Sequence, residues 1–548
     1  MKDPILHINP NELNDIASLR AGLIQALNFI DILIQQVQQL QKQNQELRDE
    51  INRLKGEKGK PNILANSKKP VDISSQTHSE EKKDWLKKSK KAIIPIDQKI
   101  NCPIDRETLP ADARFKGYET VIGQDIIFKR NNTEYRVEVW YSPSQHKTYR
   151  SALPPSYTGY FGNNLKAFCI SMHYTMDVTH NKLLAFLGGM GIEISDGSMQ
   201  NMLTENSDLW LTEKNDLLKA GLEGSYLQTD STSAREHGQN RRTHVFVSEF
   251  FGVFSTQPGK SRLDILSALQ GQPEQGIMLQ CNQLALDFFD HYHISPKYRQ
   301  DIQRLFIKQP VIGMDEFHSM ADEKLPALKK KTNTYKWVIE ALALGYYFEQ
   351  TEYPAPHVLV SDDAREYFLL ALYRMLCWIH DARFYNKLTP LVENHRIELE
   401  KFMNRYWDFY GLLKQYKQNP TPEFKLQIER KFDETFIPNT TYFGLNKEIE
   451  RTLSNKKQLL TVLDFSFIPL HNNASELAAR RQVRKRDVHL HTMTSLGTKI
   501  QDAFLSIIHT SFLLGVDAYQ YILGRINGDA EFYLPELVRE RIQASHQH

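Results

Sequence analysis

The chain has 548 residues, which is too long for one ordinary domain and predicts roughly three or four folding units. Its 68 Lys and Arg nearly balance 66 Asp and Glu, so net charge neither favours nor excludes a nucleic-acid partner. Four widely spaced cysteines exclude a disulfide scaffold and predict a reducing, cytoplasmic setting. The N-terminus lacks a signal-peptide core and no uninterrupted apolar run reaches about 18 residues, so we expect no membrane segment.

A heptad repeat marks the first segment, 12–55. Branched residues at its a positions and Leu at its d positions favour a parallel two-stranded coiled coil, and a polar residue at one a position fixes the register. The a positions are Leu23, Ile30, Val37, Asn44 and Ile51, and the d positions are Ala26, Leu33, Leu40, Leu47 and Leu54. We therefore expect a homodimer held by Leu33, Leu40, Asn44, Leu47 and Leu54. The alternative is an amphipathic helix that packs on its own domain.

Two segments of different composition follow. Residues 56–92 are rich in Lys, Gly, Ser and Pro, which predicts a flexible basic linker. Residues 93–160 are rich in β-branched and aromatic residues. Within them, ETVIGQDIIFKR and TEYRVEVWYSPS flank Asn131–Asn132, so we expect a β-hairpin that turns there.

Residues 161–222 have a helical pattern with a break at Gly188–Gly191. Ser195 or Asp196 is a suitable N-cap for the helix after the break. The spacing fits a DNA-binding helix-turn-helix, and it fits two core helices joined by a tight turn nearly as well.

The segment 223–490 mixes short strands with helices, which predicts an α+β core. One short strand is expected to end at Asp230, and a second to end at Asp362 and Asp363. A later helix, capped by Asn472 or Asn473, carries Glu476. Residues from about 262 to 350 are expected to be mixed and mostly helical, whereas long amphipathic helices are expected to fill about 364–460. The segment 491–548 closes the chain with more helices.

Asp230, Asp362 and Glu476 form a candidate site for divalent metal. Hard cations prefer carboxylate oxygens. Two such ions can stabilise both the attacking and the leaving oxygen at phosphorus. Strand ends converge at one edge of a sheet, so these acids can meet although they are far apart in sequence. On strand position alone, Asp315, Glu316 and Asp363 compete with them.

Five basic residues follow Glu476 on the same predicted helix: Arg480, Arg481, Arg484, Lys485 and Arg486. Arg480 and Arg484 lie on roughly the same helical face as Glu476. Beside a metal-binding carboxylate they would hold phosphates; the alternative is a solvated helix with ion pairs. Cys377 and His380 lie one helical turn apart, and could ligate zinc, support the site or simply be buried.

The stretch PLHNNASELAARRQVRKRD resembles a signature of the insertion-sequence sixty-six family of bacterial transposases. HVLVSDDAREY and CWIHDARFYNKL resemble a second block of that family. The resemblance implies a ribonuclease-H-like core that cuts and joins DNA at insertion-sequence ends. It implies two Mg²⁺ or Mn²⁺ ions bound by Asp230, Asp362 and Glu476. The implied partners are terminal repeats, target DNA and helper proteins from the same element, in a bacterial cytoplasm near the nucleoid.

The sequence departs from the family at three places. Cys102 is alone, with Asp105 where a second cysteine is expected, so we expect no zinc in the ribbon-like region. Leu477 replaces the Arg that follows the glutamate. The stretch 271–355 looks like an insertion. Alternatives to a transposase are an inactive transposase-derived DNA-binding protein, a coiled-coil scaffold, and a different ribonuclease-H-like nuclease.

Overall fold

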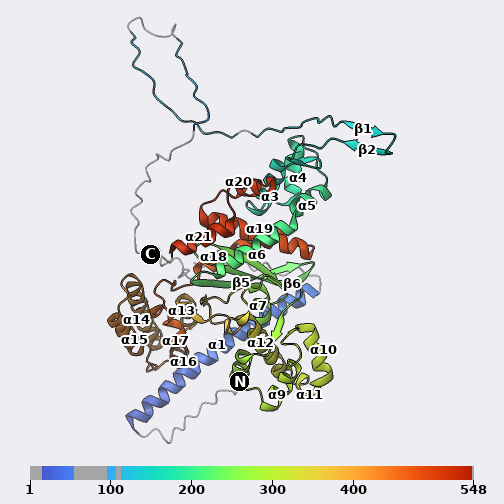
Figure 1. The fold of residues 1–548 in the computed structure, drawn as a ribbon. Coiled ribbons are helices and arrows are strands. Elements are labelled where there is room, and N and C mark those ends of the chain that lie inside the picture. The colour runs from blue at the N-terminus through green and yellow to red at the C-terminus, as the bar shows by residue number, and fades with distance from the viewer. Residues whose placement is uncertain (1–14, 55–95, 106–112, 127, 546–548) are drawn as a thin grey trace.

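The computed structural model describes residues 15–54, 96–105, 113–126 and 128–545. The predicted linker 56–92 lies outside these ranges. The described chain is a mixed α+β protein built around one five-stranded sheet (Figure 1). Helices cover the sheet on both sides in Figure 1, with α3–α6 and α19–α21 on one side and α8–α12 on the other.

The sheet has the strand order β11-β10-β5-β6-β7, with β5 at its centre. Strands β5, β6 and β7 pair antiparallel, whereas β10 runs parallel to β5 and β11 parallel to β10. The strands are β5 (Tyr226–Glu236), β6 (Gln239–Val247), β7 (Gly252–Gln257), β10 (Val358–Ser361) and β11 (Tyr373–Leu376). Strand β11 lies in a stretch where only helices were expected.

The prediction that the first core strand ends at Asp230 is wrong, because β5 continues to Glu236. A two-residue turn, His237–Gly238, has positive φ at both positions, the geometry that matches the twist of a β-hairpin. The polar residues after Asp230 therefore pair with β6, out to Glu236 opposite Gln239. Asp230 consequently lies inside the central strand.

Alternating side chains of β6 serve two different cores, as the twofold period of a strand requires. Val245 and Val247 pack with Ala478 and Ala479 of α18 (Asn473–His489). Phe246 belongs to the larger core that includes residues of α7 and α12. The sheet is thus covered on both faces, and α18 is pressed directly onto one of them.

Helix α19 (Ser495–Leu514) covers the edge strand β7. Its side chains at four-residue intervals accept hydrogen bonds from alternate β7 amides. Ser506 accepts from Phe254 N at 2.9 Å, Thr510 from Gly252 N at 3.2 Å, and Asp502 from Thr256 N at 2.6 Å. These side chains satisfy donors that an open sheet edge would leave unpaired.

The helical predictions for 262–350 and 364–460 are confirmed apart from short strands. The first stretch contains α7 (Arg262–Leu269), β8 (Met278–Gln280), α8 (Gln283–His291), α9 (Pro296–Leu305), β9 (Val311–Gly313), α10 (Met314–Lys324), α11 (Pro326–Lys329) and α12 (Thr332–Glu349). The second contains a short turn η3 (Arg365–Tyr367), then α13 (Trp378–Asn386), α14 (Glu393–Gln418), α15 (Pro422–Thr435), α16 (Phe443–Ser454) and α17 (Lys456–Leu459), followed by η4 (Thr461–Leu463). A second core of aromatic residues around Trp378 joins α13–α16 to β10 and β11.

The region 161–222 folds into α3 (Asn163–Tyr174), α4 (His180–Gly189), α5 (Asp196–Thr204) and α6 (Ser207–Leu222). The predicted break and cap are confirmed, since α4 ends at Gly189 and the Ser195 hydroxyl accepts from Ser198 N before α5. The C-terminal helices α20 (Ala518–Asn527) and α21 (Leu534–Ser545) pack on α3 and α6 respectively. A DNA-binding role for α4 and α5 stays a prediction.

The predicted turn at Asn131–Asn132 is wrong. The described residues 113–126 and 128–138 contain no strand, and the hairpin is formed by β1 (Val139–Ser142) and β2 (Lys147–Arg150). Its turn contains Pro143, whose fixed φ suits a turn, and His146 at positive φ. Two further short strands, β3 (Tyr157–Thr158) and β4 (Phe161–Gly162), pair just before α3. Figure 1 shows the β1-β2 hairpin extending from the body.

Helix α1 (Ile16–Leu54) uses one face to dock on its own chain and leaves the heptad face exposed. The docked face carries buried Asn28 and Asp31, at f and b positions. Asn28 donates to Thr441 O and accepts from Phe443 N, and Asp31 Oδ2 lies 2.6 Å from Nδ1 of the buried His395. The reading of this segment as a helix that packs on its own domain is therefore correct, although the contacts use residues outside the a and d positions. The coiled-coil dimer stays a prediction.

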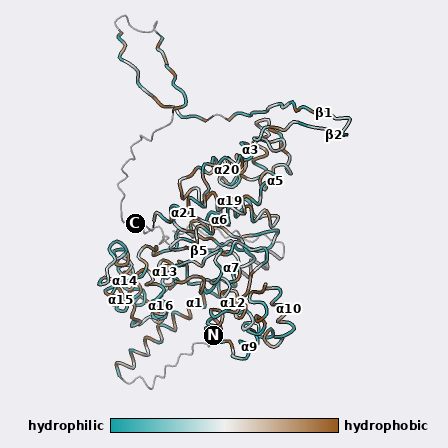
Figure 2. The backbone as a smooth tube through the Cα atoms, in the orientation of Figure 1, coloured by the Kyte–Doolittle hydropathy of each residue, from teal (hydrophilic) through white to brown (hydrophobic). Residues whose placement is uncertain are grey.

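The heptad face of α1 has no partner within the described chain. Leu33, Leu40 and Leu47 are 42%, 63% and 63% exposed, and Asn44 is exposed as well; the side chain of Leu54 lies outside the described part. Figure 2 shows hydrophobic residues along this outer helix. By length and composition alone, Ile16–Gln41 is also apolar enough to cross a membrane, although the sequence contains no uninterrupted apolar run of that length. The buried polar contacts of Asn28 and Asp31 instead tie this stretch to the protein body.

Candidate active site

Asp230 lies on β5, and Asp362 directly follows the adjacent parallel strand β10. The register pairs Val358 with Tyr226 and Val360 with Gln228. Continuing it by two residues sets Asp362, which directly follows β10, opposite Asp230. Short backbone contacts hold both carboxylates: Ser231 N donates to Asp230 at 2.7 Å, and Ala364 N donates to Asp362 at 3.1 Å.

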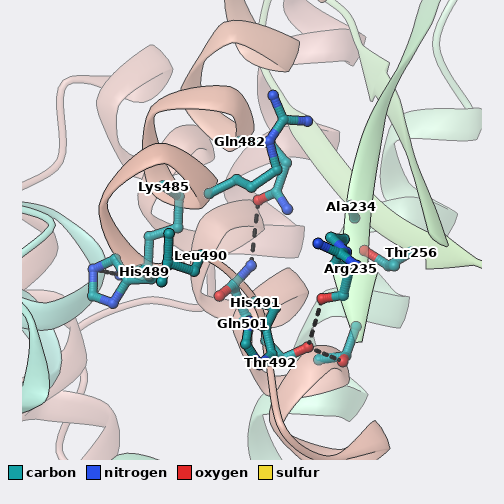
Figure 3. A pocket seen from close by; sticks show the side chains of 12 residues that line it. Ala234, Arg235, Thr256, Gln482, Lys485, His489, Leu490, His491, Thr492 and Gln501 are labelled. Carbon is teal, nitrogen blue, oxygen red and sulfur yellow. Dashed lines mark hydrogen bonds between the residues drawn. The ribbon is translucent and has the colours of Figure 1, made fainter. Parts of the chain in front are cut away.

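Glu476 reaches the same region because α18 is fixed to β5 at both ends. At its start, the Asn472 side-chain amide donates to Thr229 O at 2.7 Å, next to Asp230. At its end, Thr492 exchanges backbone hydrogen bonds with Arg235 and His237, at 3.2 and 2.8 Å. Figure 3 shows this second anchor, where Thr492 lies between Arg235 and the start of α19. The first turn of α18, which carries Glu476, is thereby held over the centre of β5.

Asn472 occupies the predicted N-cap position, but its role there differs from the expected one. Its side chain makes no capping bond to α18 and bonds to β5 instead, while its backbone N donates to Cys377 Sγ at 3.2 Å. Asn473 is the first residue of α18, and its buried side-chain oxygen has no hydrogen-bond partner. Cys377 is buried, and burial raises the pKa of its thiol to about 12. The thiol therefore supports the start of α18 as a neutral group.

Glu476 is 12% exposed and contacts two residues of α13. Arg383 donates to its Oε2 at 3.2 Å, and His380 Nε2 lies 3.4 Å from its Oε1. Burial and the Arg383 charge lower the pKa of His380, and its Nε2 accepts a hydrogen bond from Arg383 at 2.8 Å. A neutral His380 with its proton on Nδ1 cannot also donate to Glu476. The buried Glu476 Oε1 is therefore left without a hydrogen-bond donor.

The three acids influence one another electrostatically. Burial raises the pKa of Asp230 to about 6, and the negative charges of Glu476 and Asp362 add to this effect. An elevated pKa produced by burial and like charges is frequent at functional sites. Sequence reasoning named these three residues, and the fold brings their charges together.

The described residues contain no group of three His, Cys, Asp or Glu side chains already close enough to hold a metal ion. The donor set nevertheless fits a hard divalent cation, since it consists of carboxylates and includes a buried oxygen that lacks a donor. Release of Glu476 from Arg383 would free its second oxygen. Arg383 thus competes with a cation for the same carboxylate.

Several neighbours of the acids were not singled out from the sequence. Arg374 donates to Ser361 Oγ and to the carbonyls of Asp362 and Ala364, and so fixes the loop after β10. The sequence offered one indication that Arg383 lies near the acids, because Arg383 lies three residues after His380 and shares its helical face. It offered none for Arg374, because β11 was not predicted.

The competing acids lie elsewhere. Asp363 accepts a hydrogen bond from Asn455 at 3.0 Å and lies 3.8 Å from Arg451. Both partners belong to the C-terminal end of α16. Asp315 and Glu316 are exposed on α10, inside the stretch 271–355. Neither set joins the Asp230 group.

The basic residues after Glu476 divide into exposed and internal ones. Arg480 and Arg484 are exposed on the turns that follow Glu476. Arg481 is partly buried, and Arg486 donates to Ser233 on β5. The prediction that Lys485 contacts DNA is wrong for this structure: Lys485 is buried and donates to His173 O at the end of α3. Burial lowers its pKa to about 7, so it serves as an internal tie between α18 and α3.

Among known proteins, the chain is similar to uncharacterized protein y4jO of Sinorhizobium fredii, with 29% identity over 331 residues. That match spans 58% of this chain and 97% of the relative. No protein-family model and no solved structure matches the chain.

Proposed function

We propose that this protein is a DNA transposase that cleaves phosphodiester bonds at the ends of an insertion sequence and joins those ends to target DNA. The observation that carries the proposal is the meeting of Asp230, Asp362 and Glu476 on the central strands and the adjoining helix. A sheet with three antiparallel strands followed by two parallel ones is also the arrangement of a ribonuclease-H-like core, in agreement with the family resemblance.

In this proposal, each part of the chain has a separate task. Asp230, Asp362 and Glu476 would hold two Mg²⁺ or Mn²⁺ ions, which supply Lewis-acid stabilisation of charge at phosphorus. Arg480 and Arg484 hold the phosphates of the DNA strand next to the scissile bond. Water is the first nucleophile at the end of the element. The 3′-hydroxyl that is released is the second nucleophile, at target DNA.

A cleavage and joining assay tests the proposal directly. Purified full-length protein is incubated with a supercoiled plasmid, Mg²⁺ or Mn²⁺, and a labelled duplex that carries the terminal repeat expected at the end of the insertion sequence. We expect nicking at the repeat and transfer of the label to plasmid, and neither when EDTA replaces the metal. Metal-dependent cutting without preference for the repeat would instead indicate a different ribonuclease-H-like nuclease.

One observation favours a second candidate, a transposase-derived DNA-binding protein without catalysis. The ion pair between Arg383 and Glu476 occupies one of the proposed metal ligands. If this pair persists with metal present, the protein binds the repeat but does not cut it. Equal DNA binding with and without Mg²⁺, and no cleavage, would support this candidate.

We expect the exposed and the buried basic residues of α18 to affect DNA binding differently. Arg484→Ala removes one phosphate contact, so the slope of log K against log salt should become less steep by about 0.9. Lys485→Met should leave the slope unchanged, because its ammonium faces the interior. Fluorescence anisotropy across a salt series measures both slopes, and a thermal melt verifies that each variant is folded. Equal changes of slope in the two variants would contradict the assignment of Arg484 as exposed to DNA and Lys485 as internal.

We also expect the exposed heptad face of α1 to hold two copies of the chain together. Leu40→Lys places a charge in each strand at a d position and should shift the protein from dimer to monomer at micromolar concentration. Gln39→Lys is the matched control, since Gln39 is exposed on the same helix outside the a and d positions. Sedimentation velocity distinguishes the two states. A wild-type monomer would remove the coiled coil from the proposal.

A further inference from the structure

An open cavity of about 700 Å³ lies between α7, the helices of the stretch 271–355, and the turn η3. Its lining is unusual in combining aromatic rings with cationic side chains. The lining residues are Lys260, Ser261, Arg262, His291, Tyr292, Lys336, Trp337, Glu340, Arg365, Glu366 and Phe368. The lining includes none of Asp230, Asp362 and Glu476, and no residue of α18.

Two parallel aromatic rings form one wall of the cavity. The rings of Tyr292 and Trp337 are stacked with an interplanar angle of 6° and a centroid separation of 6.0 Å. Trp337 remains 39% exposed, which is a large apolar surface to leave in water. A flat, partly exposed indole next to a second ring is a platform on which a planar group can stack.

The charges around this platform favour an anionic ligand. The lining carries four cationic side chains and two carboxylates, a net charge of 4 − 2 = +2. Arg262 pairs with Glu340 as part of the internal framework. Lys260 and Lys336 keep 66% and 57% of their side-chain surface exposed, and their nearest carboxylates are 3.7 and 3.9 Å away. Because these ion pairs are long and their lysines are largely exposed, each ammonium can exchange its carboxylate for phosphate oxygens.

The cavity is joined to the carboxylate site by the turn η3. This turn begins three residues after Asp362 and contributes Arg365 and Glu366 to the cavity wall. Arg262 donates to the carbonyls of Arg365 and Phe368, at 3.0 and 2.9 Å, and also to the Tyr292 hydroxyl at 2.6 Å. A single guanidinium thus connects the aromatic platform to the loop that carries Asp362.

We propose that this cavity binds one unpaired nucleotide of the DNA strand next to the cleaved phosphate, with its base on Trp337 and its phosphates at Lys260, Lys336 and Arg365. The proposal rests on the proposed transposase function and gives the stretch 271–355 a task in it. The cations grip the backbone, and the aromatic ring accepts any base, because every base has a π-face. Duplex ends must be opened for an end nucleotide to be reached in this way.

The test uses the full-length protein and two DNA probes of the same sequence. One is a fully paired duplex, and the other carries a single unpaired 2-aminopurine, whose fluorescence is quenched by stacking. In wild type, binding should quench the unpaired probe. Trp337→Ala should abolish the quenching and weaken binding of the unpaired probe by about 5- to 150-fold, whereas Trp337→Phe should retain part of both. Phe512→Ala is the matched control, because Phe512 is an exposed aromatic on α19 away from the cavity.

The outcomes separate this inference from the proposed function. Quenching that survives in Trp337→Ala, while Mg²⁺-dependent cleavage by wild type is intact, overturns the nucleotide site and leaves the transposase proposal standing. An equal loss of binding to the paired probe also overturns it, since the cavity would then grip duplex DNA. If wild type binds neither probe at low salt, both proposals fail together.

Discussion

Glu476→Gln should reduce metal-dependent DNA cleavage by about a thousandfold, while leaving DNA binding within about twofold of wild type. The change removes one negative charge and keeps the shape of the side chain. Metal ions contribute several kcal/mol of charge stabilisation in the transition state, and about 4 kcal/mol corresponds to a thousandfold in rate. Glu476 is the acid whose buried oxygen lacks a hydrogen-bond donor, so its loss acts on the cation and not on a structural contact of that atom.

The matched control is Glu316→Gln, which makes the same chemical change at an exposed acid on α10. We expect this variant to cut at the wild-type rate. Single-turnover cleavage of the labelled repeat, with enzyme in excess, measures both rates and avoids any effect of slow product release. Full activity in Glu476→Gln would remove Glu476 from the metal site and with it the proposed mechanism.

In metal-free buffer above about pH 6, Asp230→Asn should have a higher free energy of unfolding than wild type, by up to about 3 kcal/mol. Burial, with the charges of Glu476 and Asp362, raises the pKa of Asp230 from its ordinary 3.8 to about 6. For an acid whose pKa is raised on folding, the native state binds the proton more tightly than the unfolded state. The stability that Asp230 contributes is therefore full below about pH 3.8 and is lost as pH rises through about 6. Asn mimics the neutral form and avoids that loss.

Thermal or urea unfolding at a series of pH values, in EDTA, measures this difference. The two proteins should be equally stable near pH 4 and should diverge between about pH 4 and pH 6. The variant difference is needed because burial also raises the pKa of Glu213, Asp381 and Asp502, so the pH dependence of wild type alone reports several groups. Added Mg²⁺ should stabilise wild type more than Asp230→Asn, because the ion binds the carboxylate form. Parallel curves for the two proteins would show that Asp230 is not held in this environment.

Much of the local structure follows from the sequence alone. The heptad residues predicted a long helix, and Ser195 and the break after Gly188 predicted the boundary before α5. The apolar run that precedes Asp362 predicted β10. These signals are local: a repeat, a cap or a short β-branched run determines an element without reference to the rest of the chain.

The errors arise where pairing with a distant or neighbouring segment overrides local composition. The polar residues after Asp230 have weak strand propensity, yet they form a strand because β6 supplies their hydrogen bonds. Strand β11 sits in a helical context and forms because β10 offers it a parallel partner. The chain does not turn at Asn131–Asn132 and turns instead at Pro143, 143 − 132 = 11 residues later, where β1 and β2 pair.

The sequence by itself determined a short set of candidate acids, because each of them follows or lies within a recognisable element, and the family resemblance selected Asp230, Asp362 and Glu476 from that set. Only the tertiary structure decided that they meet, since the parallel register of β10 on β5 and the anchoring of α18 at both of its ends involve residues more than a hundred positions apart. It also decided which basic residues are exposed: Arg484 and Lys485 are neighbours in sequence, but α3 covers only Lys485. A helical pattern gives the spacing of side chains around an axis, whereas burial depends on what packs against that axis.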